Sequence, residues 1–371
     1  AAFASAQLFL RLRETVRDRR LAGATWVLAS FLPPLLPMAT HLYPNVIGAA
    51  LIVTAYRWLF TAPTRRPALA GALLAATLLL TPRDGLALLV LAPFAWRLGR
   101  GLGRRFTLGA AALAAAVVVL NAAAYGIPLP YVGYLYGTQQ AQELTGEPSI
   151  SFRVWVALPA ILFDRTFGLA GSAPWLFIGL LGLRAALGPS GRAEAVPEGR
   201  RAAPAAGGRP APFGRAGQAV PDNAKASDGN TIHPLLPAAA TVAASLAALS
   251  LFRYWEGGYA PPGRYFVDVL PLWAPFVAYG LAVTRTAAGL GVAARLALRA
   301  VIGIAVFMSA LAAVIFAAIP MAALNGAYDQ KFQLIYDRVL GLNPLGWLPS
   351  FQPTTPDWYV GAYLRLIPAL A

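Results

Sequence analysis

Long apolar stretches alternate with clusters of arginine along this chain, and this alternation limits what it can fold into. The first clusters fall at 11–20, 57–66 and 97–105. Hydrophobic residues make up 58% of the sequence and charged residues only 12%, which is too apolar for an ordinary globular domain. Arginine clusters between apolar spans are typical of the cytoplasmic loops of membrane proteins. The sequence therefore predicts an all-α, polytopic transmembrane helical bundle.

About seven stretches approach the roughly 17 to 25 apolar residues that a full transmembrane helix requires. They are residues 21–40, 42–60, 106–124, 173–187, 234–251, 265–284 and 300–319. Another apolar stretch, 69–96, is interrupted at Thr81, Pro82, Arg83, Asp84 and Gly85, and basic clusters flank both of its ends. A single span would place one of these clusters outside. Two short helices joined by a polar hairpin fit the positive-inside rule better.

Composition divides the chain into four parts. Residues 1–187 form the first part of the predicted bundle, and residues 234–319 form the second part. Residues 188–233 are dominated by Gly, Pro, Ala and Arg and hold few large apolar side chains. Such a segment cannot bury enough surface to offset the entropy of ordering, which predicts a disordered cytoplasmic loop. The tail, 320–371, is expected on the exterior side.

The charge and the rare residue types exclude several classes of function. The net charge is +15, but basic residues that bracket apolar spans are topology signals, so nucleic acid is not an expected partner. The chain has no Cys, which excludes disulfides, thiolate zinc sites and Cys nucleophiles. With only two His residues, well separated in the sequence, a His-based metal site is not expected. Carboxylates, Arg, Tyr, Trp and amides remain for chemistry.

The predicted topology leaves a small set of charged residues at the outer side, close to membrane depth. They are Arg83, Asp84, Asp164, Arg165, Arg253, Glu256, Arg264 and Asp268. Charges at such positions are costly and usually functional. If the helices pack into one bundle, we expect these residues to meet at one exterior cavity. There an Arg could bind phosphate, and a carboxylate could take a proton from an acceptor hydroxyl.

The segment 254–265 is the densest of these regions in aromatic residues, and it carries Trp255, Tyr259 and Arg264. Its aromatic rings could stack on sugars, and Arg264 is the first choice for binding phosphate, at the start of a predicted span. Glu256 is a candidate catalytic carboxylate that would orient an acceptor. The alternative is an aromatic belt with a Pro-Gly turn and an arginine that extends to the membrane interface.

Other candidates are open to structural explanations. Arg83 is the second choice for a phosphate clamp, or it forms a buried ion pair with Asp84 that caps two short helices. Asp164 and Arg165, after a predicted interfacial helix at 154–163, could pair with lipid headgroups. His41 and Tyr43, in the turn between the first two spans, could contact a ligand or only make local hydrogen bonds.

Four motifs occur together in a characteristic order. They are Leu42-Tyr43-Pro44-Asn45 at the start of a span, Arg83 within a split helical pair, Leu162-Phe163-Asp164-Arg165 leading through Gly168-Leu169 to Ala173-Pro174-Trp175, and Pro262-Gly263-Arg264-Tyr265 leading to Leu270-Pro271. In this order they resemble bacterial GT-C membrane glycosyltransferases, the group related to protein O-mannosyltransferases and aminoarabinose transferases. The resemblance covers most of the chain apart from 188–233.

The resemblance implies an enzyme of the bacterial inner membrane that transfers a sugar from a polyprenyl-phosphate donor to an acceptor on the outer face. Membrane lipid would be its other partner. The candidates for the donor phosphate are Arg264, Arg83 and Arg253. Those for the acceptor or sugar are Trp255, Tyr259, Tyr43 and His41, and the candidate catalytic carboxylates are Glu256 and Asp164. A divalent metal cofactor stays open, although no ligand cluster supports one.

The chain also departs from the family pattern. The family's principal carboxylate lies in its first exterior loop, and this chain is expected to begin beyond that loop; the family often has Glu where this chain has Asn45. Two other classes of function therefore stay open. One is a transporter or lipid flippase, since interrupted helices and charges near the membrane are also typical of transporters. The other is a noncatalytic membrane subunit.

Overall fold

Every regular element in the described part of the chain is helical, as predicted. The computed structural model describes residues 1–40, 44–81, 83–126, 128, 154–164, 168–188, 233–251, 263–286, 291–318, 341 and 348. Its elements are α1 (Ala2–Thr15), α2 (Arg19–Phe31), α3 (Leu35–Thr40), α4 (Pro44–Tyr56), the π-helical turn η1 (Arg57–Thr61), α5 (Pro67–Ala76), η2 (Thr77–Leu79), α6 (Leu86–Arg97), α7 (Arg100–Tyr125), α9 (Val154–Phe163), α10 (Leu169–Ser172), η3 (Pro174–Phe177), α11 (Ile178–Leu187), α13 (Leu236–Leu249), η5 (Arg264–Phe266), α14 (Leu270–Thr286) and α15 (Val292–Ala318).

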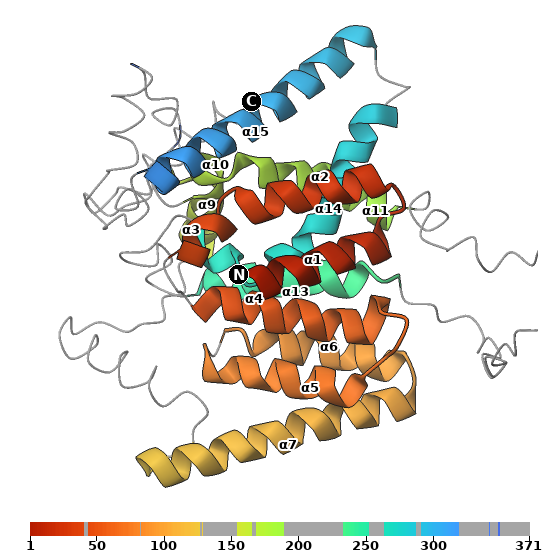
Figure 1. Cartoon of the computed structure of the whole chain (residues 1–371), viewed down its shortest axis with the longest axis vertical. Coiled ribbons are helices and arrows are strands. Elements are labelled where there is room, and N and C mark those ends of the chain that lie inside the picture. The colour runs from red at the N-terminus through yellow and green to blue at the C-terminus, as the bar shows by residue number, and fades with distance from the viewer. Residues whose placement is uncertain are drawn as a thin grey trace, which may run out of the picture.

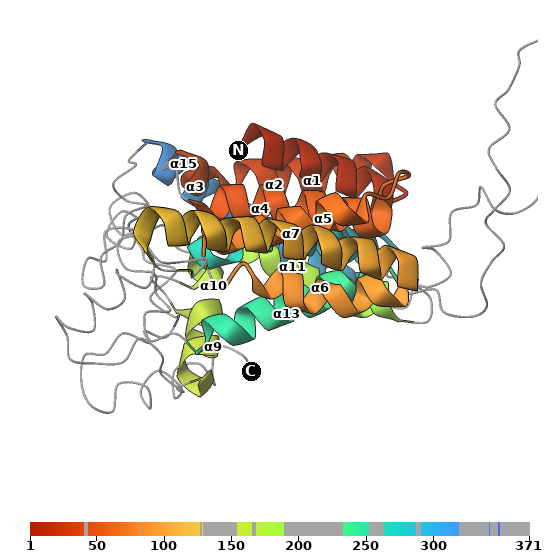
Figure 2. The same ribbon diagram turned by 90° about the horizontal axis from the view of Figure 1, so that it is seen from below.

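The helices stack beside one another, with α7 at the lower edge and α15 at the upper edge of Figure 1. Seen from below, α1, α2, α4, α5, α6 and α7 run in similar directions, whereas α9 crosses them (Figure 2). The turns after α1, α4 and α6 lie at one end of this stack, and the turn between η2 and α6 lies at the other (Figure 1). We call the first end, which carries Arg65, Arg66 and Arg100, the basic end.

The polar hairpin expected around Arg83 is confirmed, because the apolar stretch 69–96 forms two helical segments rather than one. The first ends with η2 at Leu79, and the second begins with α6 at Leu86. Helix α9, Val154–Phe163, has the bounds expected of the interfacial helix. These boundaries follow from the interruption of apolar sequence by polar and turn-forming residues.

The expected single span at 21–40 is wrong, since the structure divides it into α2 and α3. Helix α2 ends at Phe31, and the next residues are Pro33 and Pro34. Proline has no backbone N–H and its ring clashes with the preceding helical turn, so two in succession end the helix. The Nε1 of Trp175 donates a hydrogen bond to the Pro33 carbonyl at 2.8 Å, which satisfies one backbone group exposed by this break.

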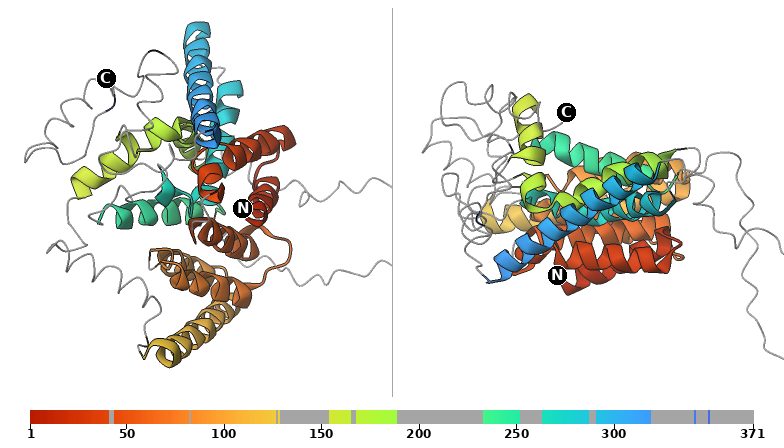
Figure 3. Two further views of the ribbon diagram at one scale, coloured as in Figure 1. Left: turned by 60° about the vertical axis from the view of Figure 1, so that its left-hand side comes forward. Right: turned by 90° about the horizontal axis from the view of Figure 1, so that it is seen from above.

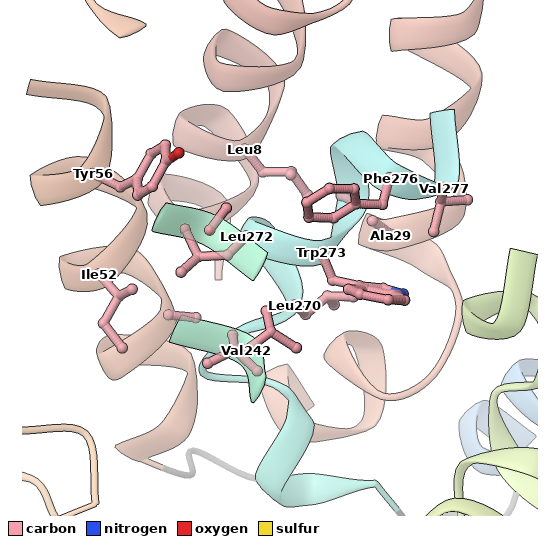
Figure 4. Close-up of a cluster of buried hydrophobic side chains, with 14 of the residues drawn as sticks. Leu8, Ala29, Ile52, Tyr56, Val242, Leu270, Leu272, Trp273, Phe276 and Val277 are labelled. Carbon is pink, nitrogen blue, oxygen red and sulfur yellow. The ribbon is translucent and has the colours of Figure 1, made fainter. Parts of the chain in front are cut away.

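Helix α14 is the centre of the hydrophobic core. Figure 4 shows its side chains among those of α1, α2, α4 and α13. The buried side chains drawn there include Leu8, Ala29, Ile52, Tyr56, Val242, Leu270, Leu272, Trp273, Phe276 and Val277. Because α14 is covered on most sides, whatever lies at its start is held by several neighbouring helices at once.

Two helix pairs approach so closely that only glycine fits between their backbones. A Cβ atom on Gly109 of α7 would lie 1.9 Å from the Ala68 carbonyl oxygen of α5, and one on Gly71 would lie 2.1 Å from that of Phe106. In the same way, a Cβ on Gly182 of α11 would lie 1.7 Å from the Phe276 carbonyl oxygen of α14. Small residues that let helix backbones touch are typical of helix pairs in membranes.

Helices α7 and α15 are long and apolar enough to cross a membrane by length and composition, and they alone meet that test among the described residues. Only 17% of the most apolar window of α7 and 28% of that of α15 is buried within the protein. Leu108 and Val119 of α7 and Ile304 and Phe307 of α15 are all more than 60% exposed. The other predicted spans form shorter or interrupted helices, so the count of about seven spans stays a prediction.

The basic segment 11–20 was expected to be a loop, and this is wrong for Arg11, which is fully buried on α1. Its Nη1 donates to the Pro271 carbonyl at 2.7 Å and its Nη2 to the Leu272 carbonyl at 3.3 Å. Pro275 lies inside α14 and has no N–H, so it leaves the Pro271 carbonyl without its normal helical donor. The guanidinium also lies 4.2 Å from the centre of the Tyr56 ring. Arg11 thus completes the backbone bonding of the central helix.

We expect Gly109→Ala to lower stability by about 1 to 3 kcal/mol, because an added methyl group must push α5 and α7 apart. Gly101→Ala in the same helix is the matched control, since nothing lies within 4 Å of its Cβ position and alanine favours the helix. Thermal unfolding of the purified protein in detergent, followed by tryptophan fluorescence, measures both. Equal unfolding temperatures for the two variants would contradict the close contact.

The role of Arg11 predicts an energetic coupling to Pro275. Arg11→Met should destabilise the protein strongly, because it leaves the Pro271 carbonyl buried without a donor. Pro275→Ala restores a backbone N–H, so Arg11→Met should cost less in that background, by about 1 to 3 kcal/mol. A double-mutant cycle on the free energy of unfolding measures this coupling. Strictly additive effects would show that Arg11 acts through other contacts.

Candidate functional site

The candidate site is a cluster of four buried polar side chains, at the end of the bundle opposite the basic end. Asn45 comes from the first turn of α4, Arg83 and Asp84 from the turn before α6, and Asp268 from the turn before α14. Their exposed fractions are between 2% and 9%. We call these residues the polar cluster. Polar groups this deeply buried are stable only when they find partners.

Asp268 is the centre of the polar cluster. Its Oδ2 atom forms an ion pair with the Nη2 atom of Arg83 and accepts a hydrogen bond of 2.9 Å from Nδ2 of Asn45. The same Nη2 lies 3.6 Å from Oδ1 of Asp84, which is a longer ion pair. One arginine therefore serves two carboxylates, and it is much closer to Asp268.

Local backbone geometry holds the turn that carries Arg83 and Asp84. The backbone N–H of Asp84 lies 3.2 Å from both the carbonyl and the hydroxyl oxygen of Thr81. The N–H of Leu86 donates to the Arg83 carbonyl at 3.0 Å and leads into α6. These bonds fix the turn so that both charged side chains point into the protein rather than to its surface.

Gly48 gives the two carboxylates room beside α4. A Cβ atom at this position would lie 2.7 Å from Oδ2 of Asp84 and 3.1 Å from Oδ1 of Asp268. The first distance is shorter than real Cβ contacts allow, so any larger residue would displace Asp84. Both carboxylates thus face the same point of α4.

A tyrosine ring connects the polar cluster to Arg264. The guanidinium carbon of Arg83 lies 4.5 Å from the centre of the Tyr265 ring, and that of Arg264 lies 4.7 Å from the same centre. Both distances are within the range of cation–π attraction. Arg264 is therefore placed next to the polar cluster, as the first residue of η5.

The segment before Arg264 packs against the region that follows Asp164. Gly263 has a φ of +71°, and a Cβ there would lie 2.9 Å from Leu169 and 3.7 Å from the Ser172 hydroxyl of α10. Asp164 is fully buried at the end of α9, and its backbone carbonyl accepts a hydrogen bond from Gly168 at 2.9 Å. The structure thus brings Gly263 close to Leu169 and Ser172 of α10.

The pKa of the Asp84 carboxyl is raised to about 8. Burial is the largest cause, and the negative charge of Asp268 is the second. Arg83 acts in the opposite direction. Asp84 lies in the turn between η2 and α6, where a proton can stay on a carboxyl group at neutral pH only because of these surroundings.

Several predicted site residues lie outside the part of the chain that the structure describes. They are His41, Tyr43, Arg165, Arg253, Trp255, Glu256 and Tyr259. Among the residues it does describe, no group of three or more His, Cys, Asp or Glu side chains could hold a metal ion. The roles assigned to Arg83, Arg264 and Asp164 stay predictions.

Sequence reasoning missed the roles of Asn45, Gly48 and Tyr265. Asn45 drew attention only as part of a motif at the start of a span and as a departure from a family pattern. A usable signal was present, because an amide in the first turn of an otherwise apolar helix needs a buried partner. No comparable signal marks Gly48, whose importance depends on side chains from two distant segments.

A second polar network lies toward the basic end and ties α1 to α4. Arg57, in η1, forms an ion pair with Glu14 and a hydrogen bond with Gln7. The Thr61 hydroxyl donates to Glu14 at 2.7 Å. At the surface, Asp18 pairs with Arg285 at 3.1 Å. These contacts are separate from the polar cluster.

The comparisons with known proteins give no further guidance. No family model, no curated protein and no solved structure matches this chain. The geometry of the polar cluster must therefore carry any functional argument.

We expect Asp268→Asn to destabilise the protein by about 3 to 5 kcal/mol, since it leaves Arg83 buried without its closest counter-charge. Asp18→Asn is the matched control, because it breaks an ion pair whose side chains are 43% and 57% exposed and should change little. Thermal unfolding in detergent at pH 7 distinguishes the two. A loss no larger for Asp268→Asn than for the control would contradict the central role of this carboxylate.

Proposed function

We propose that this chain is a multi-pass protein of the bacterial inner membrane that transfers a sugar from a polyprenyl-phosphate donor to an acceptor on the outer face. The observation that carries the proposal is the meeting of Arg264, Tyr265 and the polar cluster at one end of a helical stack. In this proposal that end faces outward, and residues 188–233 and the basic end face the cytoplasm.

The exposed apolar surface supports the membrane part of the proposal. Helices α7 and α15 lie at opposite edges of the stack (Figure 3). Most of the apolar window of each helix is not buried by the described part of the protein. Soluble monomers rarely expose apolar patches of this extent. The arginines at the basic end agree with the positive-inside rule, which would place that end in the cytoplasm.

The chemistry of the outward end supports the transfer part. A lipid-linked donor needs a cation for its phosphate and a groove that a lipid can reach, and Arg264 adjoins the polar cluster through the Tyr265 ring. We assign the donor phosphate to Arg264, with Arg83 and Arg253 as further candidates. Asp164 and Glu256 would orient the acceptor hydroxyl. A charge that develops on the departing phosphate would be stabilised by a fixed guanidinium.

The test is transfer of radiolabelled sugar from a panel of polyprenyl-phosphate donors, in membranes that contain the full-length protein. Arg264→Gln should lower the rate by about 100-fold or more, as removal of one fixed donor from a developing anion does. Arg285→Gln is the control, because Arg285 lies on the opposite end and pairs with Asp18 at the surface. If folded wild-type protein transferred sugar from no donor, the proposal would be wrong.

A transporter is the second candidate, and one observation favours it. Asp84 is a buried carboxylate in the interruption between η2 and α6, and Asp268 pairs with Arg83 of the same turn. Broken helices around charged groups are typical of transporter binding sites. Uptake driven by a pH gradient into vesicles containing the purified protein, in the absence of any transfer activity, would favour this alternative.

A further inference from the structure

Two oxygen atoms in the polar cluster lack a hydrogen-bond donor in the described part of the chain. They are Oδ2 of Asp84 and Oδ1 of Asp268, and both are fully buried. Both face Gly48, as the distances from its Cβ position show. Two buried acceptors without a donor are unfavourable, because each has lost its hydrogen bonds to water and makes none within the protein. A single proton between them would make one a donor and the other its acceptor.

The charge of the cluster leads to the same conclusion. Arg83 carries one positive charge, whereas Asp84 and Asp268 would together carry two negative charges if both were ionised. A net charge in a buried site is costly, and one bound proton makes the cluster neutral. Among the described residues, the charged groups that act on the two carboxyl groups are Arg83 and the carboxyl groups themselves. Tyr265 contacts Arg83.

The surroundings decide which carboxyl group takes the proton. Burial raises the pKa of Asp268 as well, whereas Arg83 and Asn45 lower it. Because Asp268 receives both the close ion pair from Arg83 and the hydrogen bond from Asn45, its charged form has the better partners of the two carboxylates. Asp84 has the longer contact of 3.6 Å with Arg83, and the Thr81 side chain also favours its charged form. Burial and the charge of Asp268 outweigh both. Protonation of Asp84 therefore gives up little electrostatic stabilisation. Protonation of Asp268 would weaken both its ion pair with Arg83 and its hydrogen bond from Asn45.

We infer that Asp84 and Asp268 form a proton-binding site in which Oδ2 of Asp84 carries one proton and donates it to Oδ1 of Asp268. Binding takes one proton from solvent and changes no other bond. Release of the proton leaves two negative charges facing each other above Gly48, next to the turn between η2 and α6. The inference concerns the protein itself and does not rest on the proposed transfer reaction.

The stability of the fold should report this proton. The pKa of Asp84 is raised from 3.8 to about 8, first by burial and second by the negative charge of Asp268. Arg83, which also contacts the Tyr265 ring, acts to lower this pKa. Between about pH 4 and pH 8, the folded protein therefore keeps a proton on Asp84 that the unfolded chain releases. Stability should therefore fall as the pH rises from about 4 to about 8, and change little above that.

The first experiment is infrared titration of the purified full-length protein in detergent, which detects the carbonyl stretch of a protonated carboxyl group. In the wild type this band should be present at pH 6 and disappear with a midpoint near pH 8. The band should be absent from Asp84→Asn. It should be unchanged in Asp18→Asn, because backbone hydrogen bonds lower the pKa of the Asp18 carboxyl in the wild type, so that Asp18 carries no proton at pH 6. A wild type without the band at pH 6, or an Asp84→Asn variant that keeps it, would overturn the inference.

Asp268→Asn distinguishes a shared proton from a carboxyl group that is merely buried. Without the anion of Asp268, Asp84 becomes the only counter-charge of Arg83, so its band should disappear at a lower pH than in the wild type. An unchanged midpoint would mean that the two residues do not share the proton. Because this variant is expected to be less stable, its folding is checked by tryptophan fluorescence at each pH.

Thermal unfolding between pH 5 and pH 9 is an independent test. The unfolding temperature of the wild type should fall as the pH rises, whereas Asp84→Asn, whose amide can donate to Asp268 at every pH, should show a flatter profile. The two profiles should differ most at pH 9, where the variant is more stable. Parallel profiles would mean that the folded protein holds no extra proton at Asp84 in this pH range. An Asp84→Asn variant that folds at no pH would mean that Asp84 is needed as an anion.

Discussion

Asp268 places a carboxylate at the start of the most deeply buried helix, where it can stay charged only if Arg83 and Asn45 reach it. These partners come from the turn before α6 and from the first turn of α4. A buried ion without its partner is strongly destabilising, so α4, α6 and α14 must be in place together. The same requirement fixes Gly48, since the carboxylates lie where any other side chain would begin. One ionic contact thus sets the positions of three helices at this end.

The interruptions of the helices follow a related rule. Each break frees backbone carbonyl groups, and in apolar surroundings these must find donors within the protein. Trp175 donates to the Pro33 carbonyl at the break between α2 and α3, and Arg11 donates to the carbonyls near Pro275 in α14. Trp273 donates to the Leu176 carbonyl at 2.9 Å, where η3 passes into α11. The prolines that interrupt the helices therefore also determine where polar side chains are needed.

The helical class and the hairpin at Arg83 could be predicted because both follow from local composition and from the side on which basic residues fall. The break at Pro33 and Pro34 had a visible signal, but the length of the apolar run outweighed it. No sequence signal indicated the burial of Arg11. Its partner carbonyl is 260 residues away in the sequence, and the positive-inside rule treats every arginine as a loop residue. Similarly, sequence placed Arg83, Asp84 and Asp268 on one side but could not show that Asp268 is the shared partner, since that depends on packing.

The ion pair within the polar cluster determines how strongly Arg83 and the neighbouring Arg264 can attract an anionic ligand. Arg83 already has a close counter-ion in Asp268, so its charge is largely compensated within the protein. Arg264 contacts the same Tyr265 ring from outside that pair. With the inferred proton on Asp84 the cluster is neutral, and the field toward a phosphate is set by Arg264. Without the proton the cluster carries one net negative charge close to Arg264, which weakens its attraction for an anion. The protonation of Asp84 and the binding of an anionic donor at Arg264 would therefore favour each other, as linked equilibria must.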